Sequence, residues 1–153
     1  MNLSPHFTLE EMIKSQVGDR AGIDNMPTPE HKEALQLLCH AVLEPIRDHF
    51  GPTVINSGYR NAAVNKLNKG KSSSQHCKGE AADIEVPGMT NWMLAKWIAK
   101  TLDFDQLILE CYKEGIPNSG WVHVSYSKKH NRKQQLTAIV VNGKMVYIPG
   151  IAQ

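Results

Sequence analysis

The chain lacks several features that mark particular classes of protein. It has no basic stripe with interleaved aromatic residues, which argues against a nucleic-acid-binding surface. No apolar run is long enough to cross a bilayer, and residues 1–6 do not have the basic segment and apolar core of a secretory signal. These absences predict a protein that is made in the cytoplasm, is not inserted into a membrane and does not bind nucleic acid.

Cysteine is scarce and shows no pairing pattern. The three cysteines, at positions 39, 77 and 111, are odd in number and lack the spacing of a disulfide framework or a cysteine zinc site. We expect them to be reduced thiols, as is usual for a protein made in the cytoplasm.

The remaining composition is that of an ordinary globular protein. Apolar residues make up 41% of the 153 residues and charged residues 21%, which is within the usual range. This length suits a single domain over residues 1–153, able to bury about two-thirds of its unfolded surface, and we expect a monomer. The net charge of +2 is small, so it indicates a generic solvated surface more than a preference for an anionic polymer.

Helices are predicted mainly in the N-terminal half. A capping box at residues 8–11 begins a short helix. Residues 15–27, rich in Gly, Asp, Asn and Pro, are expected to form a loop. Threonine and proline at 28–29 begin a helix toward Phe50, and Pro45 is expected to kink this helix or to end its regular hydrogen bonding. A further helix is expected to run from Asn61 through Leu67.

The C-terminal half predicts a sheet and one long helix. Thr90 caps this helix, whose buried stripe is expected to be Met93, Leu94, Trp97, Ile98 and Leu102. Short apolar or alternating runs predict strands at 53–56, 81–86, 106–111, 121–126, 138–141 and 145–148. The dipeptide at 142–143, Asn-Gly, is a strong hairpin signal. Strands joined by short turns favour an α+β fold, an antiparallel sheet with helices packed on one side.

Two histidines and one carboxylate form the most informative group of residues. His76 and Asp83 are seven positions apart with a glycine between them, and His123 follows forty residues after Asp83. A His2Asp set is typical of catalytic zinc, which keeps its fourth position for water, whereas structural zinc is normally closed by four ligands. Cys77 adjoins His76, but adjacent side chains usually diverge, and a fourth ligand would block the catalytic position. We therefore predict His76, Asp83 and His123 as zinc ligands.

The chain also resembles a known family through several ordered motifs. These are Ser57-Gly58-Tyr59-Arg60, Ser74-x-His76-x-x-Gly79-x-Ala81-x-Asp83, Phe104-Asp105-Gln106-Leu107-Ile108-x-Glu110, Trp121-Val122-His123-Val124-Ser125-Tyr126 and Asn131-Arg132. Together they resemble the zinc D-alanyl-D-alanine peptidases, and most closely a small, often phage-encoded branch of that family. The resemblance runs from about Leu3 to the 140s.

This resemblance implies a fold, a cofactor and a substrate class. The family has a Hedgehog-like fold with one catalytic Zn²⁺, and it includes carboxypeptidases, dipeptidases and phage endolysins that act on peptidoglycan stem peptides. A protein of this kind without a secretory signal would wait in the cytoplasm until the membrane is opened and then act on the cell wall, or would be carried by a phage particle.

The general base departs from the commonest family pattern. A peptidase needs a group that takes a proton from water and passes it to the leaving amine. Many members carry an acid three residues before the last histidine, where this chain has Gly120. Glu110 is our candidate, because it ends the strand before the His123 strand and matches the closer branch. Glu114 and Glu80 are the competing acids.

Two further residues are candidates for substrate binding. Family members use an arginine after Ser-Gly-Tyr to bind substrate or to stabilise the developing oxyanion, and Arg60 occupies that position. A guanidinium suits either role because its planar fork pairs bidentately with carboxylates. Ser74 is expected to bind substrate or to order the loop through an ordinary hydroxyl hydrogen bond.

The sequence therefore predicts a zinc-dependent peptidase acting on peptidoglycan stem peptides, as a D-Ala-D-Ala-type carboxypeptidase or a lytic endopeptidase. The alternative is a non-catalytic zinc-containing module that binds cell-wall peptides, since Hedgehog signalling domains use a similar zinc-containing scaffold for binding. Glu110 and Arg60 favour the enzyme, and the missing acid at position 120 keeps the alternative open.

Overall fold

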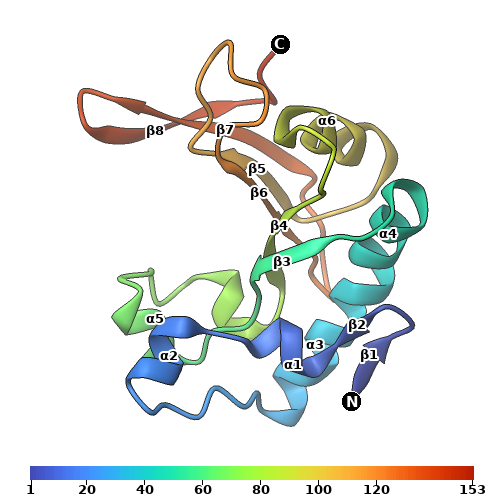
Figure 1. Cartoon of the computed structure of the whole chain (residues 1–153), viewed down its shortest axis with the longest axis vertical. Coiled ribbons are helices and arrows are strands. Elements are labelled where there is room, and N and C mark those ends of the chain that lie inside the picture. Colours follow the sequence, from blue (N-terminus) through green and yellow to red (C-terminus); the bar gives the residue numbers. More distant parts are fainter.

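The computed structural model describes residues 1–153 and contains a six-stranded sheet, a separate two-stranded sheet and a set of short and medium helices (Figure 1). The elements, in chain order, are β1 (Asn2–Ser4), β2 (Phe7–Thr8), α1 (Leu9–Ile13), α2 (Gln16–Arg20), α3 (Pro29–Leu38), the π-helical turn η1 (Cys39–Leu43), α4 (Glu44–Phe50), β3 (Val54–Ser57), α5 (Ala62–Leu67), the 3-10 turn η2 (Gln75–Lys78), β4 (Ala81–Glu85), α6 (Asn91–Thr101), β5 (Gln106–Glu110), β6 (Trp121–Ser125), β7 (Gln134–Val141) and β8 (Lys144–Pro149). No helix has the length and hydropathy needed to span a bilayer.

The large sheet has the strand order β3-β4-β6-β5-β7-β8. Every neighbouring pair is antiparallel except β5–β7, which is parallel. β6 ends beside the start of β5, and residues 126–133 carry the chain across that end to the other side of β5, so β7 runs parallel to β5. The predicted α+β class is confirmed, with one parallel pair in an otherwise antiparallel sheet.

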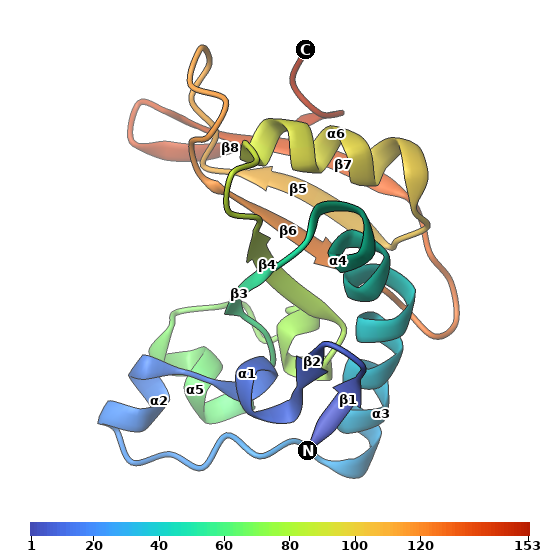
Figure 2. The same ribbon diagram turned by 45° about the vertical axis from the view of Figure 1, so that its right-hand side comes forward.

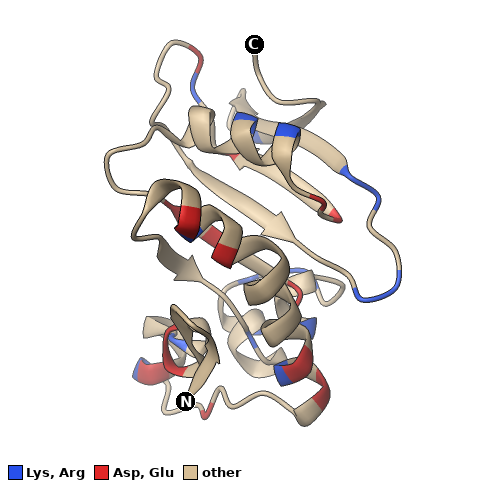
Figure 3. Ribbon diagram, turned by 90° about the vertical axis from the view of Figure 1, so that its right-hand side faces the viewer, with Lys and Arg blue, Asp and Glu red and all other residues tan.

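One face of the sheet carries the hydrophobic core. Side chains alternate between the two faces of a strand, and the apolar ones of the central strands point toward the helices. These residues are Ala82 and Ile84 in β4, Leu107 and Leu109 in β5, and Val122 and Val124 in β6. They pack with Leu35, Leu38, Val42 and Ile46 from the long helical segment and with Leu94 and Ile98 from α6. Figure 3 shows that the charged residues lie mainly on helices and loops.

The long helical segment over 29–50 forms as predicted. The Thr28 hydroxyl caps it by accepting a hydrogen bond from the backbone N–H of His31, and Pro29 occupies the first turn. The segment continues from α3 through the π-helical turn η1 into α4, with Pro45 in the first turn of α4. A proline cannot donate a backbone hydrogen bond, and the wider turn lies directly before it. Gly51, with φ of 93°, ends α4.

Two local predictions are wrong. Residues 15–27 were expected to form a loop, but they contain α2, which begins where the Ser15 hydroxyl accepts a hydrogen bond from the Gly18 N–H. Gly18 packs closely against Val64 of α5, so a tertiary contact supports this short helix. In α6, Met93 is exposed, whereas the neighbouring Ala95 is buried.

The chain ends in a hairpin that extends past the rest of the sheet (Figure 2). The turn between β7 and β8 is Asn142-Gly143, and both residues have positive φ, 51° and 76°, as a type I′ turn requires. The hairpin prediction is therefore confirmed. β8 is exposed along its whole length and forms one edge of the sheet, and β3 forms the other.

Candidate active site

The polar face of the sheet brings together residues from distant parts of the sequence. Strands β4 and β6 pair so that Asp83 lies directly opposite His123. Because Ile84, Val122 and Val124 point into the core, Asp83 and His123 project from the opposite face. Asp83 Oδ1 lies 3.0 Å from His123 Nδ1. The structure therefore brings together two of the three residues that the sequence suggests as zinc ligands.

His76 reaches this pair from the turn η2, directly before β4. The turn is capped by Ser74, whose hydroxyl accepts a hydrogen bond from the backbone N–H of His76 at 3.2 Å. His76 Nδ1 donates to the carbonyl oxygen of Gly58 at 2.7 Å, and its other ring nitrogen, Nε2, faces Asp83 Oδ1 at 3.4 Å. A hydrogen bond from the outer nitrogen to a backbone carbonyl is the usual way in which proteins orient a metal-binding histidine.

The turn after His76 depends on Gly79. Its φ of 74° lies in the left-handed region, and a Cβ there would collide with the carbonyl oxygen of His31 in α3. Any other residue would strain the turn and push it away from the helix. The glycine between His76 and Asp83 therefore allows the turn to pack against α3 and to present His76 to the sheet.

The donor atoms of His76, Asp83 and His123 fit one metal ion. All lie within 4.8 Å of one another. Two ligand atoms at about 2.1 Å from a tetrahedral zinc ion are about 3.4 Å apart, close to the 3.4 Å and 3.0 Å between Asp83 and the two histidines. Both imidazoles are buried and Asp83 is partly buried. No cysteine belongs to the group, although Cys77 follows His76.

The charge state of Asp83 also suits a cation. Burial alone would raise the pKa of this carboxyl, but hydrogen bonds and charge from His123 and His76 outweigh it and hold the pKa well below its usual range. Asp83 is therefore ionised at neutral pH. It therefore offers a negative charge to a metal ion at this position.

A second group of possible ligands, His6, Glu44 and Asp48, is explained without a metal. Glu44 accepts hydrogen bonds from the Ser4 hydroxyl at 2.6 Å, from the His6 backbone N–H at 2.8 Å and from the His6 ring at 2.7 Å. Its carboxylate oxygens are thus fully engaged in fastening the N-terminal strand to the long helical segment. This group has no part in the candidate site.

Glu110 lies on the same face of the sheet as the candidate metal ligands. In the β5–β6 pair, Ile108 is opposite His123 and Glu110 is opposite Trp121, so the acid is one row further along the polar face. Its Oε1 is buried and has no hydrogen-bond partner. Burial raises the pKa of Glu110, the positive charge of His123 opposes that rise, and the negative charge of Asp83 adds to it. A carboxylate with a raised pKa accepts a proton more readily than an ordinary glutamate does.

The competing acids lie elsewhere. Glu114 is exposed on the loop after β5, beyond the cleft. Glu80 is engaged by the Gln75 side chain at 3.3 Å and lines a different hollow, beside α3. Of the three acids that the sequence suggested as a general base, only Glu110 lines the cleft that contains His76, Asp83 and His123.

Arg60 and Ser74 line the same cleft. The backbone N–H of Arg60 donates to the carbonyl oxygen of His76 at 3.1 Å, which fixes the arginine beside the candidate ligand. Its side-chain Nε is buried and has no hydrogen-bond partner. Tyr59 is in the core, with its hydroxyl 2.9 Å from His31 Nδ1, whereas Trp121 lines the cleft.

The cleft has a volume of about 690 Å³, and several of its lining residues were not predicted from the sequence. Asp105, for which no role was predicted, forms a bidentate ion pair with Arg132, and Arg132 lines the cleft. Tyr147, from the C-terminal hairpin, lines it too. Three lysines on the loop and turn that deliver His76 complete this group: Lys69, Lys71 and Lys78. Arg132 was visible only as part of the Asn131-Arg132 motif.

A family model described as Peptidase M15 matches residues 5–125. The matched segment contains every element from β2 to β6 and all of the predicted site residues. Arg132, Tyr147 and the β7–β8 hairpin lie beyond it. Comparison with individual curated proteins gives no match.

Proposed function

The chain belongs to the peptidase M15 family, and on that premise we propose that it is a zinc-dependent peptidase that hydrolyses peptidoglycan stem peptides. The observation that carries this proposal is the shared cleft of His76, Asp83, His123 and Glu110. A three-residue metal group and a buried carboxylate without a partner are the parts that hydrolysis of an amide bond needs.

We propose His76, Asp83 and His123 as the zinc ligands. When bound, zinc supplies a Lewis acid for the scissile carbonyl and lowers the pKa of a water molecule that it holds to about 7. His76 would bind through Nε2, because its Nδ1 is already donated to Gly58. The ionised Asp83 supplies one negative charge and leaves the loaded site with a net positive charge, which attracts the polarised carbonyl of a substrate.

Glu110 is the proposed general base and acid. Its raised pKa makes its carboxylate a better proton acceptor than an ordinary glutamate. It takes a proton from the attacking water and then passes this proton to the nitrogen of the leaving amine. The lack of a hydrogen-bond partner for Oε1 supports this role, because an oxygen committed to another donor would be a poor acceptor.

Arg60 and Ser74 are proposed to bind the substrate. The buried, unpartnered Nε of Arg60 is a donor that a substrate carboxylate or the developing oxyanion can satisfy. Ser74 has a structural role as the cap of η2, and its place in the cleft leaves its hydroxyl hydrogen free to donate to substrate.

We also propose a class of reaction and a place of action. The proposed reaction is that of a D-Ala-D-Ala-type carboxypeptidase or of a lytic endopeptidase, the classes that the sequence motifs suggest. The place of action is the cell wall, where stem peptides are found, and a phage endolysin or a phage-particle enzyme is the setting that the sequence motifs suggest.

A non-catalytic module that binds wall peptides is the competing function. The specific observation in its favour is Gly120, which takes the position where many family members carry their acid. The presence of Glu110 in the cleft argues against a function limited to binding.

Incubation of the zinc-loaded protein with purified muropeptides, followed by mass spectrometry, tests the proposal. We expect products in which one peptide bond of the stem has been hydrolysed, and the same reaction with His123→Ala should give none. If wild-type protein with full zinc occupancy binds these peptides but releases no product, the peptidase proposal is wrong and the binding module is correct.

A further inference from the structure

One end of the cleft holds an arginine that is fixed by a buried carboxylate. Arg132 Nε donates to Asp105 Oδ1 at 2.9 Å, and Arg132 Nη2 donates to Asp105 Oδ2 at 3.0 Å. The backbone N–H of Arg132 also donates to Oδ1, at 3.0 Å. The Asp105 side chain is 8% exposed, whereas that of Arg132 is 50% exposed. A guanidinium has five N–H donors, so three remain on the half-exposed side chain.

Asp105 is itself held in place by several groups. Gln75 Nε2 donates to Asp105 Oδ2 at 2.9 Å, and the backbone N–H of Asp105 donates to Ser125 O at 2.9 Å. The Arg132 hydrogen bond is the main cause that lowers the pKa of Asp105, and burial opposes it. The carboxylate is therefore ionised and fixes the guanidinium before any ligand arrives. Such preorganisation reduces the entropy lost when a ligand binds.

Backbone hydrogen bonds also fasten residues 126–133 to the sheet. They run from Lys133 N–H to Phe104 O and from Gln134 N–H to Asp105 O, each 3.0 Å long. An arginine that is fixed by a buried acid and still presents free donors to a cleft is typical of a site for a planar anion.

The surroundings of Arg132 are positive. Lys69, Lys71 and Lys78 line the same cleft, are exposed, and have no carboxylate within ion-pair distance. Asp105 is neutralised by Arg132. The other two acids of the cleft are the proposed metal ligand and the proposed base. This wall therefore carries uncompensated positive charge, and such charge raises the local concentration of anionic ligands.

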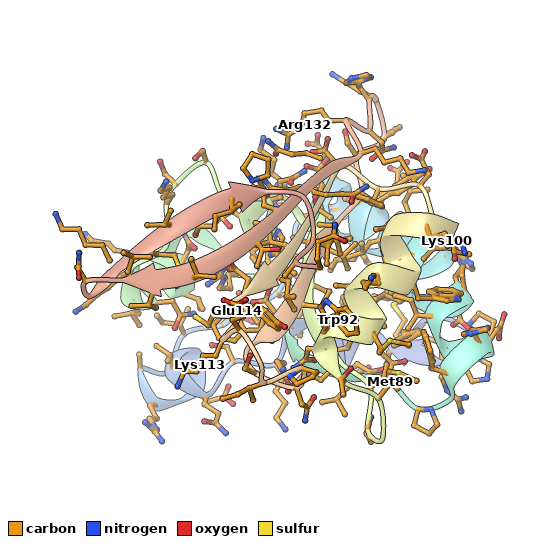
Figure 4. All side chains as sticks on the ribbon, turned by 90° about the horizontal axis from the view of Figure 1, so that it is seen from above. Met89, Trp92, Lys100, Lys113, Glu114 and Arg132 are labelled. Carbon is orange, nitrogen blue, oxygen red and sulfur yellow. The ribbon has the colours of Figure 1, made fainter.

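The position of Asp105 relative to β5 gives the approximate distance between the arginine site and the proposed zinc ligands. Ile108 is in register with His123, which is opposite Asp83, and Asp105 precedes Ile108 by three residues. At about 3.4 Å for each residue of a strand, the arginine site is about 10 Å from the row of the proposed ligands. Figure 4 shows Arg132 well apart from Glu114, which follows the other end of β5. An extended peptide covers the same 10 Å with two or three residues.

We propose that Arg132 is the centre of a carboxylate-binding subsite, which selects peptides that carry a free carboxylate two or three residues from the hydrolysed bond. Asp105 is its positioning residue, and the lysines of the facing loop strengthen the attraction. This inference rests on the proposed peptidase function. It concerns a residue outside the segment that the family model matches, and it is separate from Arg60, which adjoins His76.

Two synthetic stem peptides test the subsite. They differ in a single group, a free α-carboxylate or a carboxamide on the γ-linked glutamyl residue. We expect wild-type protein to hydrolyse the carboxylate peptide with a kcat/KM at least about tenfold higher, mainly through KM, because a hydrogen-bonded charge pair contributes on that scale. Arg132→Gln should lower the rate for the carboxylate peptide much more than the rate for the amide peptide, so that the two rates become similar.

Further variants separate recognition from folding. Arg132→Lys keeps a positive charge beside Asp105 and should fold normally, but it should lose most of the selectivity because an ammonium cannot form the fork. Asp105→Asn should reduce selectivity as well. Lys129→Gln removes the same charge from an exposed residue of the same loop that does not line the cleft, and its selectivity should equal that of the wild type.

The affinities of both peptides for Glu110→Gln protein, measured by calorimetry, keep this proposal distinct from the peptidase proposal. If the wild-type protein hydrolyses neither peptide, but the carboxylate peptide binds more tightly and this preference depends on Arg132, the subsite proposal is correct and the peptidase proposal is wrong. Equal rates and equal affinities for the two peptides would overturn the subsite. An equal loss for both peptides in Arg132→Gln would also overturn it, because Arg132 would then be purely structural.

Discussion

Gly120 lies against the backbone of Glu110, so closely that a Cβ added at Gly120 would overlap the carbonyl oxygen of Glu110. Gly120 precedes β6, has φ of 68°, and faces the last residue of β5. Position 120 therefore has no room for a side chain. Many members of the family that the sequence resembles carry an acid at this position, whereas here the adjacent strand β5 brings the carboxylate of Glu110 to the cleft. The departure from the common motif thus has a structural reason.

Gly120→Ala tests this contact through stability. We expect it to lower the free energy of unfolding by more than about 1 kcal/mol, because a positive φ and a backbone collision both oppose any Cβ. Gly115→Ala is the matched control, since Gly115 has φ of 81° and nothing within 4 Å of its added Cβ. Gly115→Ala should lower the free energy of unfolding by less than Gly120→Ala does. Urea unfolding at fixed zinc concentration measures both, and equal losses would show that the Glu110 contact adds nothing.

The metal assignment predicts a specific pattern of zinc loss. Purified protein should contain about one zinc per chain, and His76→Ala or His123→Ala should lose most of it, because removing one of three protein ligands leaves too few donors. Cys77→Ser should keep full occupancy, since Cys77 is not in the group of donor atoms. Metal analysis by mass spectrometry provides the measurement. Full occupancy in both histidine variants would contradict the assignment.

Arg60 should affect turnover without affecting the metal. Its fixed backbone and unpartnered Nε suit a bidentate contact that lysine cannot reproduce. We expect Arg60→Lys to lower kcat/KM on wall peptides by about tenfold or more, with normal zinc content. Arg20→Lys, on the exposed end of α2, is a matched control and should be silent. Unchanged kinetics for Arg60→Lys would make Arg60 a residue without a role in binding.

Much of the fold was predictable because its signals are local. The capping box at residues 8–11, the threonine and proline at 28–29 and the Asn-Gly turn each act within a few residues, and all three form as expected. The convergence of Asp83 and His123 was predictable for a related reason. Alternation in two short strands fixes the face on which each side chain lies, and only their pairing had to be assumed.

The features of the fold and of the cleft that were not predicted depend on contacts between residues far apart in the sequence. The helix α2 is supported by α5, which no residue of α2 reveals. The parallel β5–β7 pair depends on the path of residues 126–133. That same path brings Arg132 to Asp105 across 27 positions of sequence. Lys69 and Lys71 line the cleft, and no local pattern of the sequence places them there.

The pH dependence of hydrolysis should report the ionisation of Glu110. Burial raises its pKa above the ordinary 4.5, and a general base must be deprotonated to act. We therefore expect kcat/KM to fall as the pH drops through a value above 4.5, while Asp83, whose pKa is lowered, stays ionised. Zinc content measured at each pH separates this effect from loss of metal. An acid limb at or below 4.5 would contradict the raised pKa.

Glu110→Gln tests the base directly. The amide keeps the size and polarity of the side chain but cannot accept and return a proton. We expect a rate loss of at least about a hundredfold, the low end for general-base catalysis, with normal folding and normal zinc content. Glu114→Gln makes the same change on the exposed loop beyond the cleft and should be nearly silent. Hydrolysis of muropeptides by Glu110→Gln at the wild-type rate would place the base elsewhere. A fall in zinc occupancy would instead make Glu110 a metal ligand or a support for one.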